Sequence, residues 1–176
     1  KEKYMEKEKV LLNATLCFLI KANKVLLALK TQKIGKGCWN GYGGGIGDGE
    51  KIKEAAVREL KEESGGVIAD FNDLKEAAIM DFYNTKTDRE KFICRVYVYL
   101  VRNWIGEPKE TEEMANPTWF DINNLPFENL MPADKEWLPP VLKGEKIIGK
   151  AELGPFQKEL LGPVEIKRVE AFPENF

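Results

Sequence analysis

Three glutamates within five residues are the side chains of this sequence best suited to chemistry. Glu59 and Glu63 are four positions apart and Glu62 lies between them, so in a helix all three project from one side. Two like charges about 5 Å apart at an effective dielectric of about 20 repel by roughly 3 kcal/mol, so such a cluster either spreads into water or binds a cation. Carboxylate oxygens suit Mg²⁺, which keeps several waters and is often completed by phosphates. The segment alone therefore indicates either a solvated acidic face or a magnesium site.

The rest of the composition narrows the possible chemistry. The 176 residues include no histidine, which removes His bases, imidazole ligands and the usual Ser-His and Cys-His pairs. Catalysis must then rest on carboxylates, a metal, Lys or Arg. The net charge of -2 gives no field that attracts a polyanion, so we expect neither stable nucleic-acid binding nor membrane binding. Cys17, Cys38 and Cys94 form no CxxC pair, which argues against a disulfide framework or a zinc site and favours a reducing cytoplasm.

The hydrophobic patterning predicts the elements that position the glutamates. Apolar runs predict strands, the first two of which form a hairpin, at Val10–Ile20, Lys24–Leu29, Ala77–Tyr83, Phe92–Val101 and Thr118–Asp121. The segment from Lys51 to Ser64 is predicted to be an amphipathic helix with an acidic outer side, ended by Gly65-Gly66. The length fits a single domain over residues 1–176, a mixed sheet with helices on its faces.

Three segments carry less definite signals. The run from Trp39 to Gly45 has too many glycines for a regular strand, so its backbone is expected to turn or to pack closely against a ligand or the following helix. The segment from Ala133 to Leu142 has helical character that Pro139-Pro140 should interrupt. Residues 147–176 could supply a final hairpin, and residues 1–9 are expected to be a flexible extension.

Residues 44–66 resemble the Nudix box. Gly44 is followed six residues later by Glu50, and then come Arg58-Glu59-Leu60, Glu62-Glu63 and Gly65. The family has an aliphatic residue after the last glycine, whereas this chain has Gly66 and only then Val67, which would shift the helix exit by one residue. The resemblance implies the Nudix fold, an α/β/α sandwich with a mixed central β-sheet.

The resemblance also implies roles for the residues of the box. Glu59 and Glu63 correspond to the principal ligands of Mg²⁺, for which Mn²⁺ could substitute, and Glu62 and the carbonyl of Gly44 or Gly45 correspond to further ligands. Arg58 and Glu50 correspond to residues that orient the ligands. The alternative for Arg58 is an ordinary helix pair with Glu62 or Glu54.

Beyond the box, the chain is similar to the MutT-like hydrolases of the animal type, which act on oxidised purine nucleoside triphosphates. The segment Trp39-Asn40-Gly41-Tyr42-Gly43-Gly44 carries this similarity. By this similarity Asn40 corresponds to a residue that hydrogen bonds to the base. The alternative is that Asn40 is a structural residue of a glycine-rich turn. Thr15 corresponds to a residue of the pocket-lining first strand and Lys30 to a lysine near the substrate. Glu113 corresponds to a further carboxylate at the metal, and Glu112 fits the same register.

The sequence departs from this subfamily around the base pocket. Met131 stands where an aromatic residue stacks on the base, Ala133-Asp134 replaces two adjacent aspartates, and Ile34 replaces an aromatic residue across the pocket. A lost stack removes about 1 to 3 kcal/mol of base affinity, although Met is an adaptable substitute. Asp134 is either the retained base reader or an N-cap. Met131 and Ile34 are either pocket walls or core.

The expected function is magnesium-dependent hydrolysis of a small-molecule nucleoside triphosphate, such as 8-oxo-dGTP, to the monophosphate and pyrophosphate. One alternative is another nucleoside diphosphate derivative, such as a dinucleoside polyphosphate or ADP-ribose. A second is a nucleotide-binding module without catalysis. The oligomeric state stays open, with a monomer among the alternatives.

Overall fold

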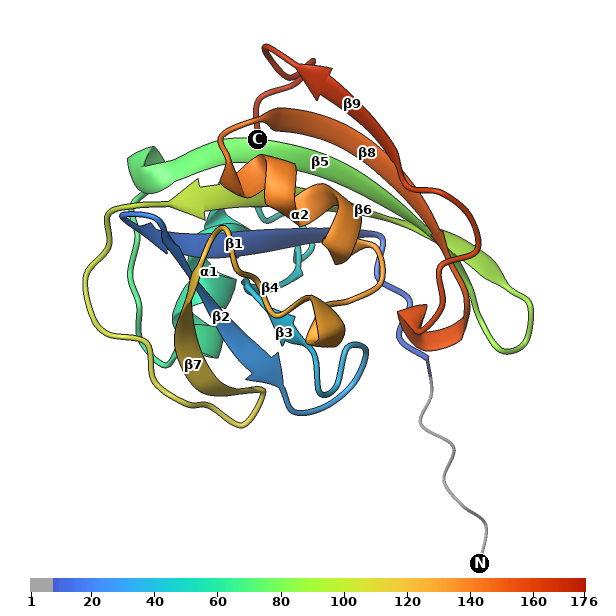
Figure 1. Ribbon diagram of the computed structural model, residues 1–176, viewed down its shortest axis with the longest axis horizontal. Helices are drawn as coiled ribbons and strands as arrows, with labels where there is room; N and C mark the ends of the chain where they lie inside the picture. The colour runs from blue at the N-terminus through green and yellow to red at the C-terminus, as the bar shows by residue number, and fades with distance from the viewer. Residues whose placement is uncertain (1–7) are drawn as a thin grey trace, which may run out of the picture.

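A computed structural model describes residues 8–176, so most of the extension expected over residues 1–9 lies outside the described residues. Strands predominate, with two α-helices between them (Figure 1). In chain order the elements are β1 (Asn13–Lys21), β2 (Lys24–Lys30), β3 (Trp39–Asn40), β4 (Tyr42–Gly45), α1 (Ile52–Ser64), η1 (Phe71–Asp73), β5 (Leu74–Thr85), β6 (Lys91–Val101), β7 (Met114–Asp121), η2 (Phe127–Asn129), α2 (Asp134–Leu142), β8 (Lys146–Leu153), η3 (Pro155–Gln157) and β9 (Glu165–Val169).

The strands form one mixed sheet in the order β3-β2-β1-β6-β5-β8-β9, with β4 paired to β1 and β7 paired to β2. The pairs β1–β6 and β5–β8 are parallel, and the others are antiparallel. The two predicted hairpins, β1–β2 and β8–β9, are confirmed. Strands β1 and β2 pair only beside their turn, at Ile20–Val25 and Lys21–Lys24. Farther along, β4 takes the place of β2 beside β1, and β2 pairs with β3 and β7 instead.

Two hydrophobic cores lie on opposite faces of the sheet, one beneath each helix (Figure 1). Leu60 and Ala56 of α1 pack with Cys17 and Tyr99, whereas Trp137 of α2 joins the core on the other face. This alternation follows from the period of two along a strand, which sends successive side chains to opposite faces. The predicted α/β/α sandwich is confirmed.

The glycine-rich segment forms two short strands, contrary to the expectation of irregular backbone. A Cβ at Gly43 would lie 1.9 Å from the carbonyl oxygen of Thr15, and one at Gly41 would lie 2.6 Å from that of Cys17. These glycines therefore permit β4 to pair closely with β1. The close contact with the following helix is also present, because a Cβ at Gly44 would lie 2.5 Å from the carboxyl carbon of Glu59.

Helix α2 differs from its prediction, whereas helix α1 ends where the sequence predicts. Helix α2 continues to Leu142 despite Pro139 and Pro140. The carbonyls that lose their usual donors belong to Lys135 and Glu136, which are both exposed residues. Helix α1 ends at Ser64 with left-handed Gly65 as its cap, so its exit is not shifted.

Gly66 continues this turn with φ +127°, a conformation that glycine alone adopts readily. The aliphatic side chain that the family places after the last glycine is then supplied by Val67, which is fully buried. The departure from the box pattern is thus accommodated in the loop and leaves the helix unchanged.

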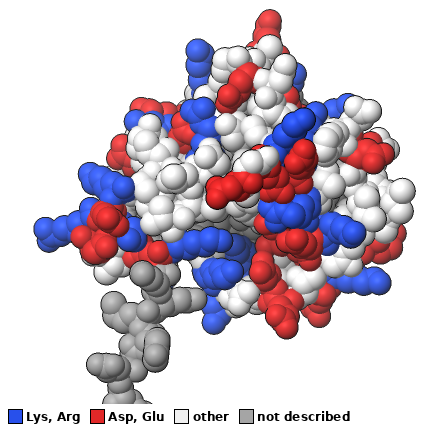
Figure 2. Space-filling view, turned by 180° about the vertical axis from the view of Figure 1, so that it is seen from behind, with Lys and Arg blue, Asp and Glu red and all other residues white. Residues whose placement is uncertain are grey.

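Within residues 8–176, no helix is long and apolar enough to cross a membrane. Acidic and basic side chains lie interspersed on the face shown in Figure 2.

Candidate active site

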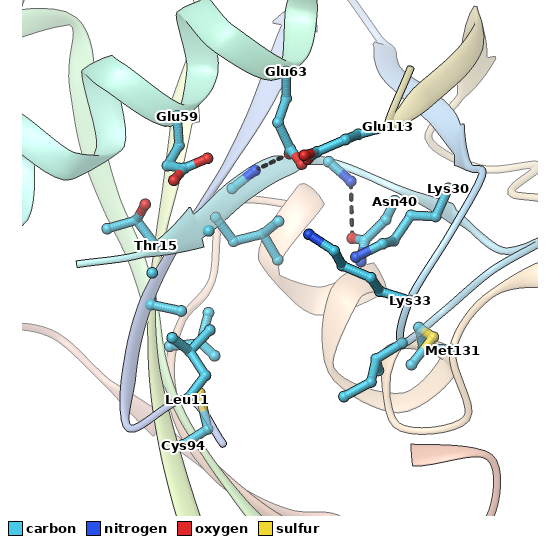
Figure 3. A pocket seen from close by; sticks show the side chains of 18 of the residues that line it. Leu11, Thr15, Lys30, Lys33, Asn40, Glu59, Glu63, Cys94, Glu113 and Met131 are labelled. Carbon is cyan, nitrogen blue, oxygen red and sulfur yellow. Dashed lines mark hydrogen bonds between the residues drawn. The ribbon is translucent and has the colours of Figure 1, made fainter. Parts of the chain in front are cut away.

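The candidate active site is a pocket of about 570 Å³ between the diverging strands β1 and β2 and the outer side of α1 (Figure 3). One end is acidic and the other is largely apolar. Of the predicted site residues, only Arg58 and Glu50, expected to orient the ligands, do not line it. The residues that do are Thr15, Lys30, Ile34, Asn40, Gly44, Gly45, Glu59, Glu62, Glu63, Glu113, Met131 and Asp134.

Glu63 and Glu113 meet at the acidic end (Figure 3). Glu63 is only 8% exposed, and its Oε1 accepts a 2.8 Å hydrogen bond from the backbone N–H of Gly43. Burial, together with contact with Glu113, raises the pKa of Glu63. The Glu113 carbonyl accepts a 3.0 Å hydrogen bond from the N–H of Thr31. Of the two adjacent glutamates at this register, Glu113 is therefore the one whose carboxyl reaches Glu63.

Arg58, which does not line the pocket, bonds to two of the carboxylates. Its Nε and Nη2 each donate to Glu50 at 2.8 Å, Nη1 donates to Glu59 at 2.8 Å, and Nη2 donates to the carbonyl of Gly45 at 3.0 Å. The bonds from Arg58, together with one from the N–H of Gly47, hold the pKa of Glu50 down at about 2. The helix pair with Glu62 is longer, at 3.5 Å. Arg58 thus fixes Glu59 from outside the pocket, and the simple helix-pair alternative does not describe its main contacts.

The carboxylates of the pocket are not close enough together to bind one metal ion in the observed side-chain conformations. No group of three or more Asp, Glu or Cys side chains in residues 8–176 is arranged to hold a metal ion, because Arg58 holds Glu59 while Gly43 holds Glu63. The donors nevertheless fit a hard divalent cation. Two carboxylates in contact, Glu63 and Glu113, repel each other unless a proton or a cation compensates their charge. Rotation of Glu59 and Glu62, whose backbones share the same helix side, would complete an oxygen-only ligand set.

Basic side chains lie between the acidic and apolar ends. Lys30 and Lys33 extend into the pocket (Figure 3), and the charge of Lys30 lowers the pKa of Glu63, against the larger effect of burial. The Asn40 Oδ1 accepts a 2.8 Å hydrogen bond from the N–H of Gly41, which leaves the Asn40 NH₂ group to face a ligand. Thr15 lines the pocket, and its buried hydroxyl has no hydrogen-bond partner among the described residues.

Asp134 lies at the apolar end, where it does not act as an N-cap. Helix α2 begins at Asp134 itself, and Ala133 occupies the cap position. The Asp134 Oδ1 accepts a 2.9 Å hydrogen bond from the indole Nε1 of Trp137. Burial raises the pKa of Asp134 to about 7, and the bond from Trp137 opposes that rise only in part. Near neutral pH, Asp134 can therefore present either a hydroxyl donor or a carboxylate acceptor to the pocket.

Met131 and Ile34 both line the pocket, on segments that precede α2 and follow β2. Met131 is 8% exposed, and its Sδ lies 3.0 Å from the position that a Cβ on Gly35 would take. Both residues therefore form pocket wall, and Met131 also packs against the loop after β2.

Several lining residues were not among the sequence candidates. The apolar end includes Leu11, Phe82, Phe92, Cys94 and Val96, and the remaining additions include Lys9, Lys33 and Gln157. The alternation of β6 indicates which of its residues share a face, but it does not say that the face borders a cavity. No sequence signal singles out Gln157, which lies in the tail after the last α-helix.

Comparison with known proteins gives consistent results. A family model described as the NUDIX domain matches residues 10–141. The chain is 34% identical over 135 residues to the oxidized purine nucleoside triphosphate hydrolase of Danio rerio, covering 77% of this chain and 82% of that protein. It is 33% identical over 108 residues to an ADP-ribose pyrophosphatase of Methanocaldococcus jannaschii, covering 60% and 59%. A MutT protein from Bacillus halodurans has the same fold, with a TM-score of 0.72 at 22% identity, covering 89% of this chain and 97% of that one.

Proposed function

This chain belongs to the Nudix family, and we propose that it hydrolyses oxidised purine nucleoside triphosphates, such as 8-oxo-dGTP, to the monophosphate and pyrophosphate. The observation that carries the proposal is the order of groups along one pocket. Carboxylates that fit a divalent cation come first, then two lysines, and then an apolar end with a buried carboxyl. A nucleoside triphosphate has matching parts in the same order, because its metal-bound polyanion leads through a sugar to a flat base.

The similarity to the animal enzyme supports the oxidised purine as substrate. The pocket supports it independently through groups that can form hydrogen bonds to a base edge. Asp134 and Asn40 offer a carboxyl and an amide at or near the apolar end. A site that pairs with one base edge rejects others strongly, since mismatched polar groups are left without partners.

Nudix hydrolases generally use divalent metal ions, and Mg²⁺, with Mn²⁺ as a substitute, is the ion we propose. Glu59, Glu62, Glu63 and Glu113, with the carbonyl of Gly44 or Gly45, would hold it. When bound, such an ion neutralises charge on the phosphates and makes water a better nucleophile.

The protein's own groups prepare that site. Arg58 restrains Glu59 and occupies the carbonyl of Gly45, and the N–H of Gly43 fixes the orientation of Glu63. Lys30 and Lys33 add positive charge where the phosphates would lie. The apolar walls exclude water from the base and strengthen its hydrogen bonds. Burial and the contact with Glu113 raise the pKa of Glu63, so a cation at this place would relieve the repulsion between the two carboxylates.

The test is to incubate the purified protein with Mg²⁺ and equal amounts of 8-oxo-dGTP, 2-oxo-dATP, dGTP, ATP and ADP-ribose, and to resolve all products by chromatography. We expect preferential loss of an oxidised purine triphosphate with release of inorganic pyrophosphate. A chelator should stop the reaction and excess Mg²⁺ should restore it. Equal rates for 8-oxo-dGTP and dGTP would contradict the proposed specificity.

A second candidate is hydrolysis of ADP-ribose. It is favoured by the similarity to the archaeal ADP-ribose pyrophosphatase and by Met131, Ala133 and Ile34, which replace the aromatic and acidic groups expected around the base. AMP and ribose phosphate as the main products would select this candidate. Binding of nucleotides without turnover in either Mg²⁺ or Mn²⁺ would instead indicate a nucleotide-binding module. In each case a small nucleotide is the partner, and we place the protein in the cytoplasm.

A further inference from the structure

A turn in the tail of the chain forms part of the pocket wall. The turn η3 follows β8, and its last residue, Gln157, lines the pocket together with Phe82 and Phe92 of β5 and β6. The segment that matches the family model ends at residue 141, so Gln157 lies beyond it. The wall at this place is therefore supplied by a part of the chain that the family pattern does not describe.

The backbone of this turn is held in an unfavourable conformation. Phe156 and Gln157 have φ values of 55° and 57°, and left-handed backbone costs roughly 1 kcal/mol or more for each residue other than glycine. Such conformations persist only where the surroundings fix them. Here the N–H of Gln157 donates to the carbonyl of Gly154 at 3.0 Å, and the N–H of Gly154 donates to the carbonyl of Glu159 at 2.9 Å.

The turn is also tied to other segments at this end of the pocket. The carboxylate of Glu8 accepts hydrogen bonds from both the N–H and the hydroxyl of Thr87, and the nearby backbone of Phe156 helps to lower the pKa of Glu8. These contacts join the segment before β1, the loop between β5 and β6, and η3. The turn is thus held from several sides, as a fixed wall requires.

The side chain of Gln157 is oriented by a buried partner. Its Nε2 donates a 2.9 Å hydrogen bond to Oδ1 of Asn84, and Nδ2 of Asn84 donates at 2.9 Å to the carbonyl of Phe82. Asn84 is only 4% exposed. This chain of bonds fixes which amide atom of Gln157 points toward Asn84. The second N–H and the carbonyl oxygen of the Gln157 amide then have capacity for a ligand.

We propose that Gln157 is a specificity-determining residue that hydrogen bonds to the base of a bound nucleotide, and that Asn84 is the residue that positions it. The proposal rests on the proposed function in one respect, the placing of the base at the apolar end of the pocket. A neutral amide with one donor and one acceptor suits the edge of a purine, where donors and acceptors alternate. It offers little to phosphate, which charged groups bind far more strongly.

Two substitutions separate the amide from the turn. Gln157→Leu keeps much of the side-chain volume and removes the amide, whereas Gln157→Gly removes the side chain and relieves the left-handed backbone. Exposed Lys158→Ala, in the same turn but outside the pocket lining, is the matched control. We expect both Gln157 variants to raise the KM for 8-oxo-dGTP about 5- to 10-fold with little change in kcat, as the loss of one uncharged hydrogen bond requires. Inhibition by inorganic tripolyphosphate, which has no base, should be unchanged.

Asn84→Ala tests the positioning role. It should raise the KM for the nucleotide by a similar factor in the wild-type background but add little when Gln157 is already Leu, because the two residues act through one contact. An additive effect in the double variant would contradict the assigned role of Asn84.

The outcomes separate this proposal from the proposed function. Wild-type turnover with an unchanged KM in both Gln157 variants would overturn the role of Gln157 and leave the proposed function standing. Equal weakening of 8-oxo-dGTP and tripolyphosphate would overturn it too, as it would indicate a distorted pocket. If the wild type hydrolyses no nucleotide, calorimetric titration with 8-oxo-dGMP decides the matter, because weaker binding by both variants supports the contact without any chemistry. Absence of binding by the wild type would overturn both.

Discussion

We expect the stability of Asp134→Asn, measured relative to that of the wild type, to be greater at alkaline pH than at acidic pH. Burial raises the pKa of Asp134 from an ordinary value of 3.8 to about 7. Between these two values the folded protein holds a proton that the unfolded chain has released, so the wild type loses stability as pH rises. The difference of about three between the folded and unfolded pKa values corresponds to about 4 kcal/mol above pH 7.

Urea unfolding of both proteins at about pH 5 and about pH 8.5 measures this effect. The difference in free energy of unfolding should change by about 3 kcal/mol between these conditions in favour of Asp134→Asn, since about two pH units separate pH 5 from the folded pKa. The substitution keeps an oxygen that can accept the hydrogen bond from the indole of Trp137. Exposed Asp48→Asn is the control for loss of one carboxylate.

A difference that stays constant with pH would refute the reasoning. It would mean that the carboxyl of Asp134 is charged in the folded protein throughout this range, and therefore that water or donors in the pocket compensate its burial. The proposed switch of Asp134 between donor and acceptor near neutral pH would then be wrong as well.

Three further substitutions test the site and the fold. Glu63→Gln should lower kcat by more than about a hundred-fold, because it removes a carboxylate from the proposed metal site, where several kcal/mol of charge stabilisation are at stake; circular dichroism should show an intact fold. Lys33→Ala should raise the KM for a triphosphate about 5-fold at low salt and less at high salt, whereas Lys36→Ala, outside the pocket lining, should not. Gly43→Ala should destabilise the protein by about 3 kcal/mol in urea unfolding, because its Cβ would lie 1.9 Å from a backbone oxygen of β1.

Each of these expectations has its own contradicting result. Undiminished turnover by Glu63→Gln would remove Glu63 from the metal site. A salt-independent effect of Lys33→Ala would indicate that its contribution is not the attraction of phosphate charge. For Gly43, the control is Gly162→Ala, where the new Cβ would meet nothing within 4 Å; equal stability of the two alanine variants would show that β4 and β1 can separate without cost.

The sequence by itself determined the chemistry and the class of fold. Glu59 and Glu63 are four residues apart, and helical periodicity alone puts them on one side. The strand signals and the box likewise predicted a mixed sheet covered by helices, which is observed. These inferences succeed because they depend on local spacing, which the chain carries in every conformation.

Other features were decided only by contacts between distant segments. The glycines of β4 are too numerous for the strand pattern, but their lack of side chains is what allows β4 to pair with β1. A Cβ at Gly43 would lie only 1.9 Å from the carbonyl oxygen of Thr15. The prolines of α2 are predicted to interrupt it, but the carbonyls that they leave without donors belong to exposed residues, and Trp137 packs the helix into the core.

The site shows the same division. Glu112 and Glu113 are indistinguishable along the chain, and the bond from Thr31 to the Glu113 carbonyl helps to fix the register in which Glu113 reaches Glu63. Gln157 stands 73 residues from Asn84 in sequence, and nothing in its neighbourhood marks it as part of a pocket. Residue types and spacing determined what chemistry this chain can perform. The paths of its strands and tail decided which side chains line the pocket, because burial and strand pairing depend on contacts with distant segments of the chain.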